Sequence, residues 1–193
     1  MMERSTRLDR ALWTRWIVRV GGTDKGRWRK VANFNHAWST RHELMAAWIR
    51  PRDVVIDLGS GPGRFAAHLP SGCRYIPVDL VPRGPGSVVR DLNREPMPDL
   101  RGDFVVMSGV LEYIHDLPGF LAGTVRLAPR AAASYACAET FSNLRARRAN
   151  GWVNQCTEPE LRSMFATAGW EVLEDVEWSD QHLFHLRAAG AEW

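Results

Sequence analysis

The most constraining feature of the sequence is an apolar run that passes directly into a glycine-rich turn, residues 54–65 (VVIDLGSGPGRF). The run is typical of a strand that is buried on both faces of a sheet. Glycines let the backbone approach a ligand closely, and the helix start that follows offers free N–H groups. We therefore expect a strand, a ligand-binding turn and a helix, the unit that binds nucleotides in open α/β sheets.

The spacing inside this turn excludes two classes of nucleotide site. The sequence contains no GxxxxGK[ST] phosphate loop, and the third glycine position of a GxGxxG dinucleotide loop falls on Arg64. The turn instead has the form Asp-x-Gly-x-Gly-x-Gly, made by Asp57, Gly59, Gly61 and Gly63, with Ser60 inside it. A carboxylate at this place repels a pyrophosphate but can pair with an ammonium group.

The rest of the chain alternates between strand and helix patterns. Expected strands cover residues 74–79, 87–90, 103–107, 132–137, 170–173 and 182–186, and expected helices cover residues 39–49, 63–69, 117–127 and 157–169. This alternation predicts an α/β three-layer sandwich with a mostly parallel sheet. Only residues 80–86 join the second and third strands, so we expect a loop in place of the usual crossover helix.

Two further acidic residues follow expected strands. Asp79 ends the second strand, where a carboxylate can accept hydrogen bonds from both hydroxyls of a ribose. Asp91, with Leu92 beside it, follows the third strand, where an acid can accept a hydrogen bond from the exocyclic amine of adenine. The alternative for each is an ordinary turn or cap residue.

Taken together, the glycine turn and the two acids make the chain resemble the class I S-adenosylmethionine-dependent methyltransferases, over roughly residues 38–188. The resemblance implies a Rossmann-like, seven-stranded sheet whose last strand is antiparallel. It also implies that the glycine turn holds the methionine part of S-adenosyl-L-methionine. Asp79 and Leu80 would then bind the ribose, and Asp91 and Leu92 the adenine.

The same resemblance extends to residues around the glycine turn. Residues 108–116 (SGVLEYIHD) look like the family's VLEH-type loop, which implies that Ser108 and Gly109 contact the cofactor and that Tyr113 contacts the acceptor. Arg41 is expected to pair with the carboxylate of the cofactor, the alternative being a solvated side chain on a basic helix. His36 is expected to bind substrate, because the segment before the glycine turn often folds over the cofactor.

The sequence pattern identifies the residues that bind the methyl acceptor less clearly than those that bind the cofactor. His115 is the expected base, because histidine titrates near neutral pH; its alternative is a cap of the next helix. The cluster of Arg145, Arg147 and Arg148, close to Trp152, suits an acidic or phosphorylated acceptor, or else forms a solvated charge run on a short helix. The sequence leaves open whether Glu112 contacts a ligand or only packs.

The net charge of +3 is unevenly distributed, because the N-terminal region, here called the front end, is basic. Residues 1–50 carry 11 Lys and Arg against 4 Asp and Glu (11 − 4 = +7), whereas residues 51–193 carry 14 against 18 (14 − 18 = −4). We expect residues 1–37 to form a basic helical extension of a methyltransferase domain at 38–193. Within it, residues 5–20 place Leu and Trp on one side of a helix, which can lie on an anionic membrane, pack on the sheet or form a homodimer contact.

Simple observations argue against a membrane-spanning protein, a secreted protein and a zinc protein. No run of 18 apolar residues is present, five of the first ten residues are charged, and the three cysteines lie far apart. We therefore expect a cytoplasmic protein, in peripheral contact with the membrane at most, and no metal site.

The sequence thus predicts an S-adenosylmethionine-dependent methyltransferase that acts, at oxygen, on a small molecule or a glycan- or lipid-linked acceptor, which the arginines would allow to be acidic. One alternative is an RNA methyltransferase, which the basic front end favours but the absence of an Asn/Asp-Pro-Pro-Tyr-type loop does not. The other is a non-catalytic subunit that binds the cofactor and a partner, against which the intact glycine turn argues.

Overall fold

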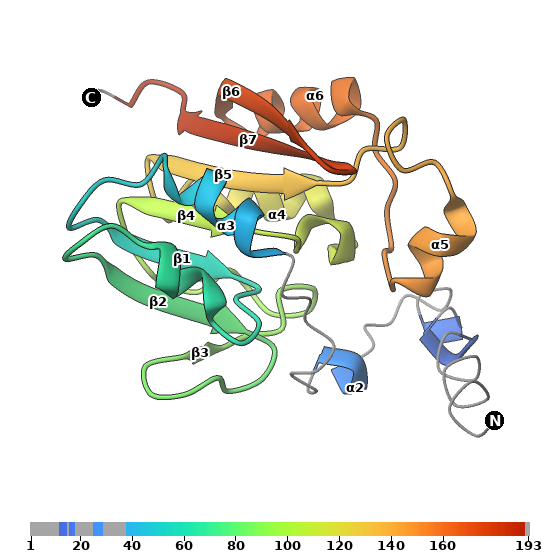
Figure 1. Ribbon diagram of the computed structural model, residues 1–193, viewed down its shortest axis with the longest axis horizontal. Helices are drawn as coiled ribbons and strands as arrows, with labels where there is room; N and C mark the ends of the chain where they lie inside the picture. The colour runs from blue at the N-terminus through green and yellow to red at the C-terminus, as the bar shows by residue number, and fades with distance from the viewer. Residues whose placement is uncertain (1–11, 15, 18–24, 29–37, 192–193) are drawn as a thin grey trace.

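The computed structural model describes residues 12–14, 16–17, 25–28 and 38–191, and these form a seven-stranded sheet with helices on both faces (Figure 1). The strand order is β3-β2-β1-β4-β5-β7-β6. Neighbouring strands from β3 to β5 are parallel, while β7 is antiparallel to both β5 and β6. The predicted three-layer sandwich, with a mostly parallel Rossmann-like sheet and an antiparallel last strand, is confirmed.

The strands are β1 (Val54–Leu58), β2 (Arg74–Asp79), β3 (Val88–Val89), β4 (Phe104–Met107), β5 (Arg130–Tyr135), β6 (Trp170–Trp178) and β7 (Gln181–Ala188). The helices are α2 (Lys25–Trp28), α3 (Ser39–Ala46), α4 (Leu117–Thr124), α5 (Leu144–Ala149) and α6 (Glu158–Ala168), with 3-10 helices η3 (Arg64–His68) and η4 (Leu111–Tyr113). β5 begins and ends two residues before its predicted bounds, β6 extends five residues beyond its predicted end, and β7 extends by one residue at its start and two at its end.

The central strands send alternate side chains into two separate cores. Val55 and Val106 pack with Met45 of α3 on one face. Ile56 packs on the opposite face with Leu121 of α4 and the side chains of α6. Because successive side chains of a strand point to opposite faces, a strand buried on both must be apolar along its length, as predicted for β1.

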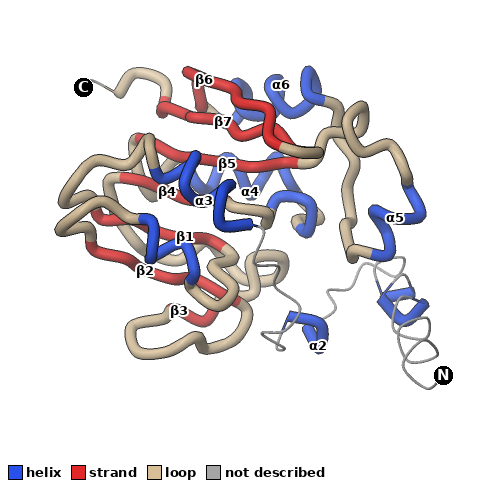
Figure 2. The backbone as a smooth tube through the Cα atoms, in the orientation of Figure 1, coloured by secondary structure: helices blue, strands red, loops and turns tan. Residues whose placement is uncertain are grey.

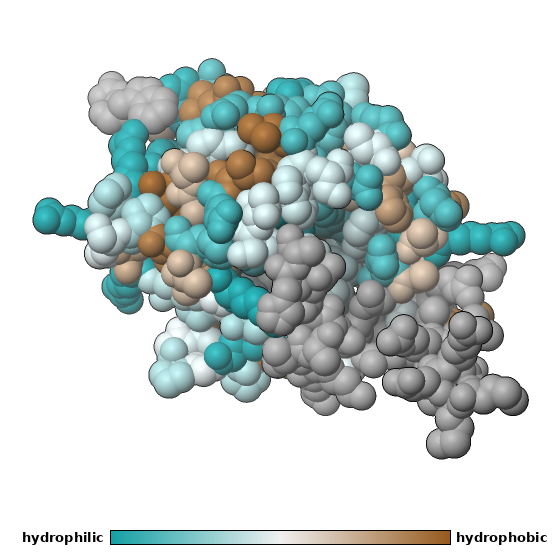
Figure 3. Space-filling view, viewed as in Figure 1, coloured by the Kyte–Doolittle hydropathy of each residue, from teal (hydrophilic) through white to brown (hydrophobic). Residues whose placement is uncertain are grey.

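The two faces are covered unequally. The side of α4 and α6 has two packed helices, whereas the side of α3 has one short helix and the 3-10 helix η3. On the face seen in Figure 3, polar side chains predominate, and apolar ones show in small patches over β5 to β7. The segment between β2 and β3 forms only turns and bends, so the predicted reduced connection is confirmed.

The carboxyl ends of the parallel strands meet at one edge of the sheet, and α2 and α5 lie beyond that edge (Figure 2). The chain returns from this edge through α6. That helix begins at a capping box formed by Thr157 and Glu160 and ends at Gly169, which has a φ of 93°. The sequence predicts both boundaries correctly.

Only part of the predicted helix at 5–20 lies within the described residues. Residues 12–14 and 16–17 are helical, and they present both tryptophans of this stretch to solvent rather than to the sheet. Trp13 and Trp16 are therefore not packed on the sheet. None of the helices in the described ranges is long and apolar enough to cross a membrane.

Candidate active site

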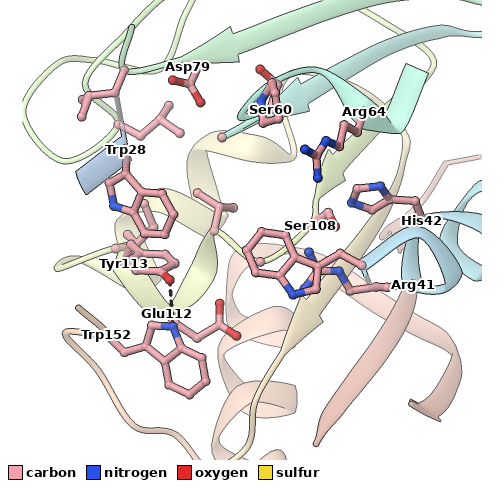
Figure 4. A pocket seen from close by; sticks show the side chains of 18 of the residues that line it. Trp28, Arg41, His42, Ser60, Arg64, Asp79, Ser108, Glu112, Tyr113 and Trp152 are labelled. Atoms are coloured by element: carbon pink, nitrogen blue, oxygen red, sulfur yellow. Dashed lines mark hydrogen bonds between the residues drawn. The ribbon is translucent and has the colours of Figure 1, made fainter. Parts of the chain in front are cut away.

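A cavity of about 410 Å³ opens at the carboxyl edge of the sheet (Figure 4). This is the edge at which open α/β sheets bind ligands. One side, which we call the strand-end wall, follows β1, β2, β3 and β4 and consists of Gly59, Ser60, Asp79, Leu80, Asp91, Leu92, Ser108 and Gly109. The other, which we call the aromatic wall, consists of Trp28, Trp38, Tyr113 and Trp152.

The glycine turn adopts a backbone that only glycine supports without strain. Gly59, Gly61 and Gly63 have φ values of 74°, 54° and 73°. A Cβ at Gly59 would lie 2.6 Å from Cγ2 of Val110, so the turn packs directly on the segment after β4. Gly59 and Ser60 reach the cavity, whereas Gly61 and Gly63 shape the turn without lining it.

Asp79 ties the glycine turn to the end of β2. Its buried carboxylate accepts hydrogen bonds from the backbone N–H of Gly61 at 2.8 Å and of Val81 at 3.1 Å, and from Nε of Arg83 at 3.2 Å. A carboxylate has about four acceptor positions, so it can still accept from a ligand in the cavity. Asp79 therefore holds the turn in shape and faces the cavity at once.

Asp91 follows β3 and lies at the same wall. It is buried, and one carboxylate oxygen accepts from the backbone N–H of Asn93 at 3.2 Å, while the side chain of Glu95 accepts from the backbone N–H of Asp91. Asp91 thus stabilises a turn and also lies at the cavity, so both predicted positions for this residue are met. Leu92 lies next to it along the wall.

Asp57 lies beneath the wall and does not line the cavity. It is buried, and the hydroxyl of Tyr75 donates to its Oδ2 at 2.5 Å. Burial raises the pKa of Asp57 to about 7; the Tyr75 hydrogen bond and the nearby Arg41 oppose the shift, and Asp79 adds to it. A cationic group above the turn would stabilise the ionised form of this carboxyl.

Arg41 lines the cavity from α3 and is almost fully buried. Its Nη1 donates to Oε1 of Gln181 at 2.9 Å, and its guanidinium lies 5.1 Å from the ring centre of Trp38. Burial lowers its pKa, and the neighbouring Glu112 raises it. The alternative for Arg41, a solvated side chain on a basic helix, is wrong because the residue is buried.

Glu112 lies between the two walls, where Figure 4 shows its carboxyl group at the cavity. Oε1 accepts from the backbone N–H of Ala136 at 3.0 Å and from Nε2 of Gln181 at 3.4 Å, while the buried Oε2 has no hydrogen-bond partner among the described residues. Burial raises the pKa of Glu112 against the opposing effect of its hydrogen bonds and of Arg41. Glu112 thus both packs against the end of β5 and lines the cavity.

Three members of the aromatic wall are held together by contacts among their own side chains. The ring of Trp28 meets that of Tyr113 edge to face at 4.9 Å, and Nε1 of Trp152 donates to the hydroxyl of Tyr113 at 3.0 Å. The buried guanidinium of Arg147 lies 4.9 Å from the ring centre of Trp152. The sequence pattern predicts Tyr113 and Trp152 at the site but not Trp28 and Trp38, for which the only signal in the sequence is that five of the nine tryptophans precede residue 50.

The other predicted acceptor residues lie elsewhere. His115 is exposed and outside the cavity lining; Asp116, not His115, caps α4. Arg145 is exposed and also outside the lining, and Arg148 donates to the backbone carbonyl of Trp152 at 2.8 Å, which supports the wall from behind. His36 lies outside the described residues.

The order of the strands, the antiparallel last strand and the glycine turn at the first strand define the class of protein as a class I S-adenosylmethionine-dependent methyltransferase. A family model described as a methyltransferase domain matches residues 27–175, and the chain belongs to this family. The resemblance seen in the sequence is therefore confirmed. No curated protein matches the chain in sequence.

Solved structures of methyltransferases share the fold. The Burkholderia thailandensis 1,6-didemethyltoxoflavin-N1-methyltransferase has a TM-score of 0.64 and 21% identity, over 97% of this chain and 90% of that one. CalO1, a methyltransferase of calicheamicin biosynthesis, has a TM-score of 0.64 and 20% identity over 79% of this chain; the match spans 54% of CalO1. The putative methyltransferase solved with the Haloferax volcanii activator Trm112 has a TM-score of 0.66 and 17% identity, over 86% and 95% of the two chains. At these identities the likeness establishes the fold.

Proposed function

We propose that the protein methylates a hydroxyl group of a small, flat molecule that binds against the aromatic wall. One observation carries the proposal: a single continuous cavity has cofactor-type residues on one side and three tryptophans with Tyr113 on the other. Two proteins of the same fold support a small-molecule acceptor by their names, since one methylates N1 of 1,6-didemethyltoxoflavin and the other belongs to calicheamicin biosynthesis.

The residues of the strand-end wall fit S-adenosylmethionine, which supplies an electrophilic methyl group on a sulfonium centre. Asp79 with Leu80 would bind the ribose, and Asp91 with Leu92 the adenine. The methionine part would lie along Gly59, Ser60, Ser108 and Gly109, with Arg41 toward its carboxylate. Two buried polar atoms there, Oγ of Ser108 and Nε of Arg41, have no partner among the described residues, which is what a polar ligand would supply.

The aromatic wall favours a planar acceptor without a positive charge. Stacked or edge-on aromatic rings gain about 0.5–1.5 kcal/mol per pair beyond the area that they bury. The guanidinium of Arg147 already lies over the ring of Trp152, so a second cation at that ring would meet like charge. A neutral or anionic ring avoids this repulsion.

Glu112 is the group that we assign to the acceptor proton. A carboxyl whose pKa is raised by burial accepts a proton more readily than an exposed one, and Glu112 lies between the two walls. His115, the residue predicted for this role, is exposed outside the cavity lining. Most of the remaining rate enhancement would come from holding the acceptor near the methyl group and excluding water.

Methyl transfer from radiolabelled S-adenosylmethionine into a fractionated cell extract tests this function. We expect label in the small-molecule fraction, and a loss of at least about tenfold in Glu112→Gln with cofactor binding retained. Glu177→Gln, an exposed glutamate on β6, is the matched control and should be fully active.

Other outcomes of this assay contradict the proposal in distinct ways. Label in the glycan or lipid fraction would replace the acceptor class. Label in nucleic acid would indicate an RNA methyltransferase, and cofactor binding without any labelled product would indicate a cofactor-binding subunit.

A further inference from the structure

Three of the most exposed large apolar side chains in the described part of the chain gather on the N-terminal helical residues. Trp13 is 57% exposed, Trp16 55% and Leu12 50%. The two indole rings stack on one another, with centroids 5.3 Å apart. An exposed cluster of this kind marks an interaction surface, since single exposed apolar residues are common but grouped tryptophans are not.

The opposite side of the same residues is attached to the body of the protein. Thr14 is 1% exposed, and a Cβ at Gly151 would lie 3.2 Å from its Cγ2. Gly151 directly precedes Trp152 of the aromatic wall. The stretch therefore docks beside the cavity through Thr14 and turns Trp13 and Trp16 outward.

The charge of the sequence that contains these residues favours an anionic partner. Residues 1–20 contain five arginines against one glutamate and one aspartate, so 5 − 2 = +3, within a front end of +7 over residues 1–50. In the neighbouring α5, Leu144 is 48% exposed and Arg145 is exposed as well. A second copy of the chain would bring this positive charge against itself, whereas an anionic surface would neutralise it.

We propose that this N-terminal stretch docks the protein on an anionic lipid bilayer, with Trp13 and Trp16 at the boundary between headgroups and acyl chains. Tryptophan suits that depth because its ring is apolar and its N–H is polar, and arginines beside it meet lipid phosphates. The contact of Thr14 with Gly151 then places the aromatic wall close to the lipid surface. The proposal does not depend on which acceptor is methylated.

Sedimentation of the full chain with lipid vesicles tests the docking. We expect binding to vesicles of phosphatidylcholine mixed with phosphatidylglycerol, no binding to phosphatidylcholine alone, and weaker binding as salt is added. The double variant Trp13→Ser/Trp16→Ser should bind the anionic vesicles at least about tenfold more weakly. Leu173→Ser, an exposed apolar residue of β6, is the control and should bind as the wild type does.

Three outcomes would overturn the proposal. They are equal binding to neutral vesicles, unchanged binding by the double variant, and no binding to the anionic vesicles. If the protein in this last case is dimeric in solution and the double variant is monomeric, the surface belongs to a second copy. Titration of each preparation with S-adenosylhomocysteine confirms folding, so a negative vesicle result remains separate from a failure of the proposed methyl transfer.

Discussion

The two walls of the cavity differ in how the sequence produces them. Each part of the strand-end wall lies at the end of a strand or just after it, so the parallel pairing of β1 with β2 and β4 brings Gly59, Asp79 and Ser108 to one edge. Three members of the aromatic wall, Trp28, Tyr113 and Trp152, are distant in sequence and meet only through tertiary packing. The wall that we propose for the cofactor is thus encoded locally, and the wall that we propose for the acceptor is encoded by the whole fold.

The largest expected effect comes from removing Asp79, which holds the glycine turn in shape and faces the cavity. Asp79→Ala should weaken binding of S-adenosylhomocysteine about 100-fold, because hydrogen bonds to a charged group contribute about 1.5–3 kcal/mol each. Isothermal titration calorimetry measures this directly. Asp99→Ala, which removes a carboxylate that is 99% exposed, is the control. If Asp79→Ala lowered the affinity for S-adenosylhomocysteine only a few-fold, Asp79 would not be a cofactor-binding residue.

A second test separates steric closeness from backbone strain in the glycine turn. Gly59→Ala should destabilise the protein by about 2–3 kcal/mol, since its Cβ would meet Val110 at 2.6 Å in addition to adopting a positive φ. Gly190→Ala has the same strain, with a φ of 80°, but open space around it, so it should cost about 1 kcal/mol. If urea unfolding gave equal losses of unfolding free energy for the two variants, the contact between Gly59 and Val110 would not be tight.

The third test uses the buried acid beneath the strand-end wall. The pKa of Asp57 is about 7 in the folded protein and ordinary in the unfolded chain, so between about pH 4 and 7 the folded state holds a proton that the unfolded state loses. This group therefore contributes most to stability at low pH, and its contribution falls as pH rises through that window. Asp57→Asn should gain about 2 kcal/mol relative to wild type between about pH 5 and pH 8. Urea unfolding at the two pH values measures this gain, and a constant difference would contradict the raised pKa.

The smallest expected effect concerns the aromatic wall and sharpens the contrast between the two sides. Trp152→Ala should raise the KM for the acceptor about tenfold and leave the affinity for S-adenosylhomocysteine unchanged. Trp152→Phe should recover part of the loss, because it retains a ring. If cofactor affinity fell in parallel with the acceptor KM, the two walls would not act separately.

The contrast between the walls also explains which features the sequence predicts. The apolar pattern of β1, the turn at Gly59 and the acid at Asp79 are local signals, and so are the capping box of α6 and the short link between β2 and β3. The arginines of α5 carry no such signal. Arg147 is buried against Trp152 while Arg145 is exposed, and no helical period shows which face of a short helix meets the protein. His115 is similar, since its exposure depends on how the loop after β4 is held by Asn93.

The most direct test of the account is a crystal structure of the protein with S-adenosylhomocysteine. We predict that the ribose hydroxyls bind Asp79, that the adenine lies against Leu92, and that the aromatic wall stays open toward an acceptor. A cofactor bound against Trp28 and Trp152, away from Asp79, would contradict the division of the cavity into two walls and the function drawn from it.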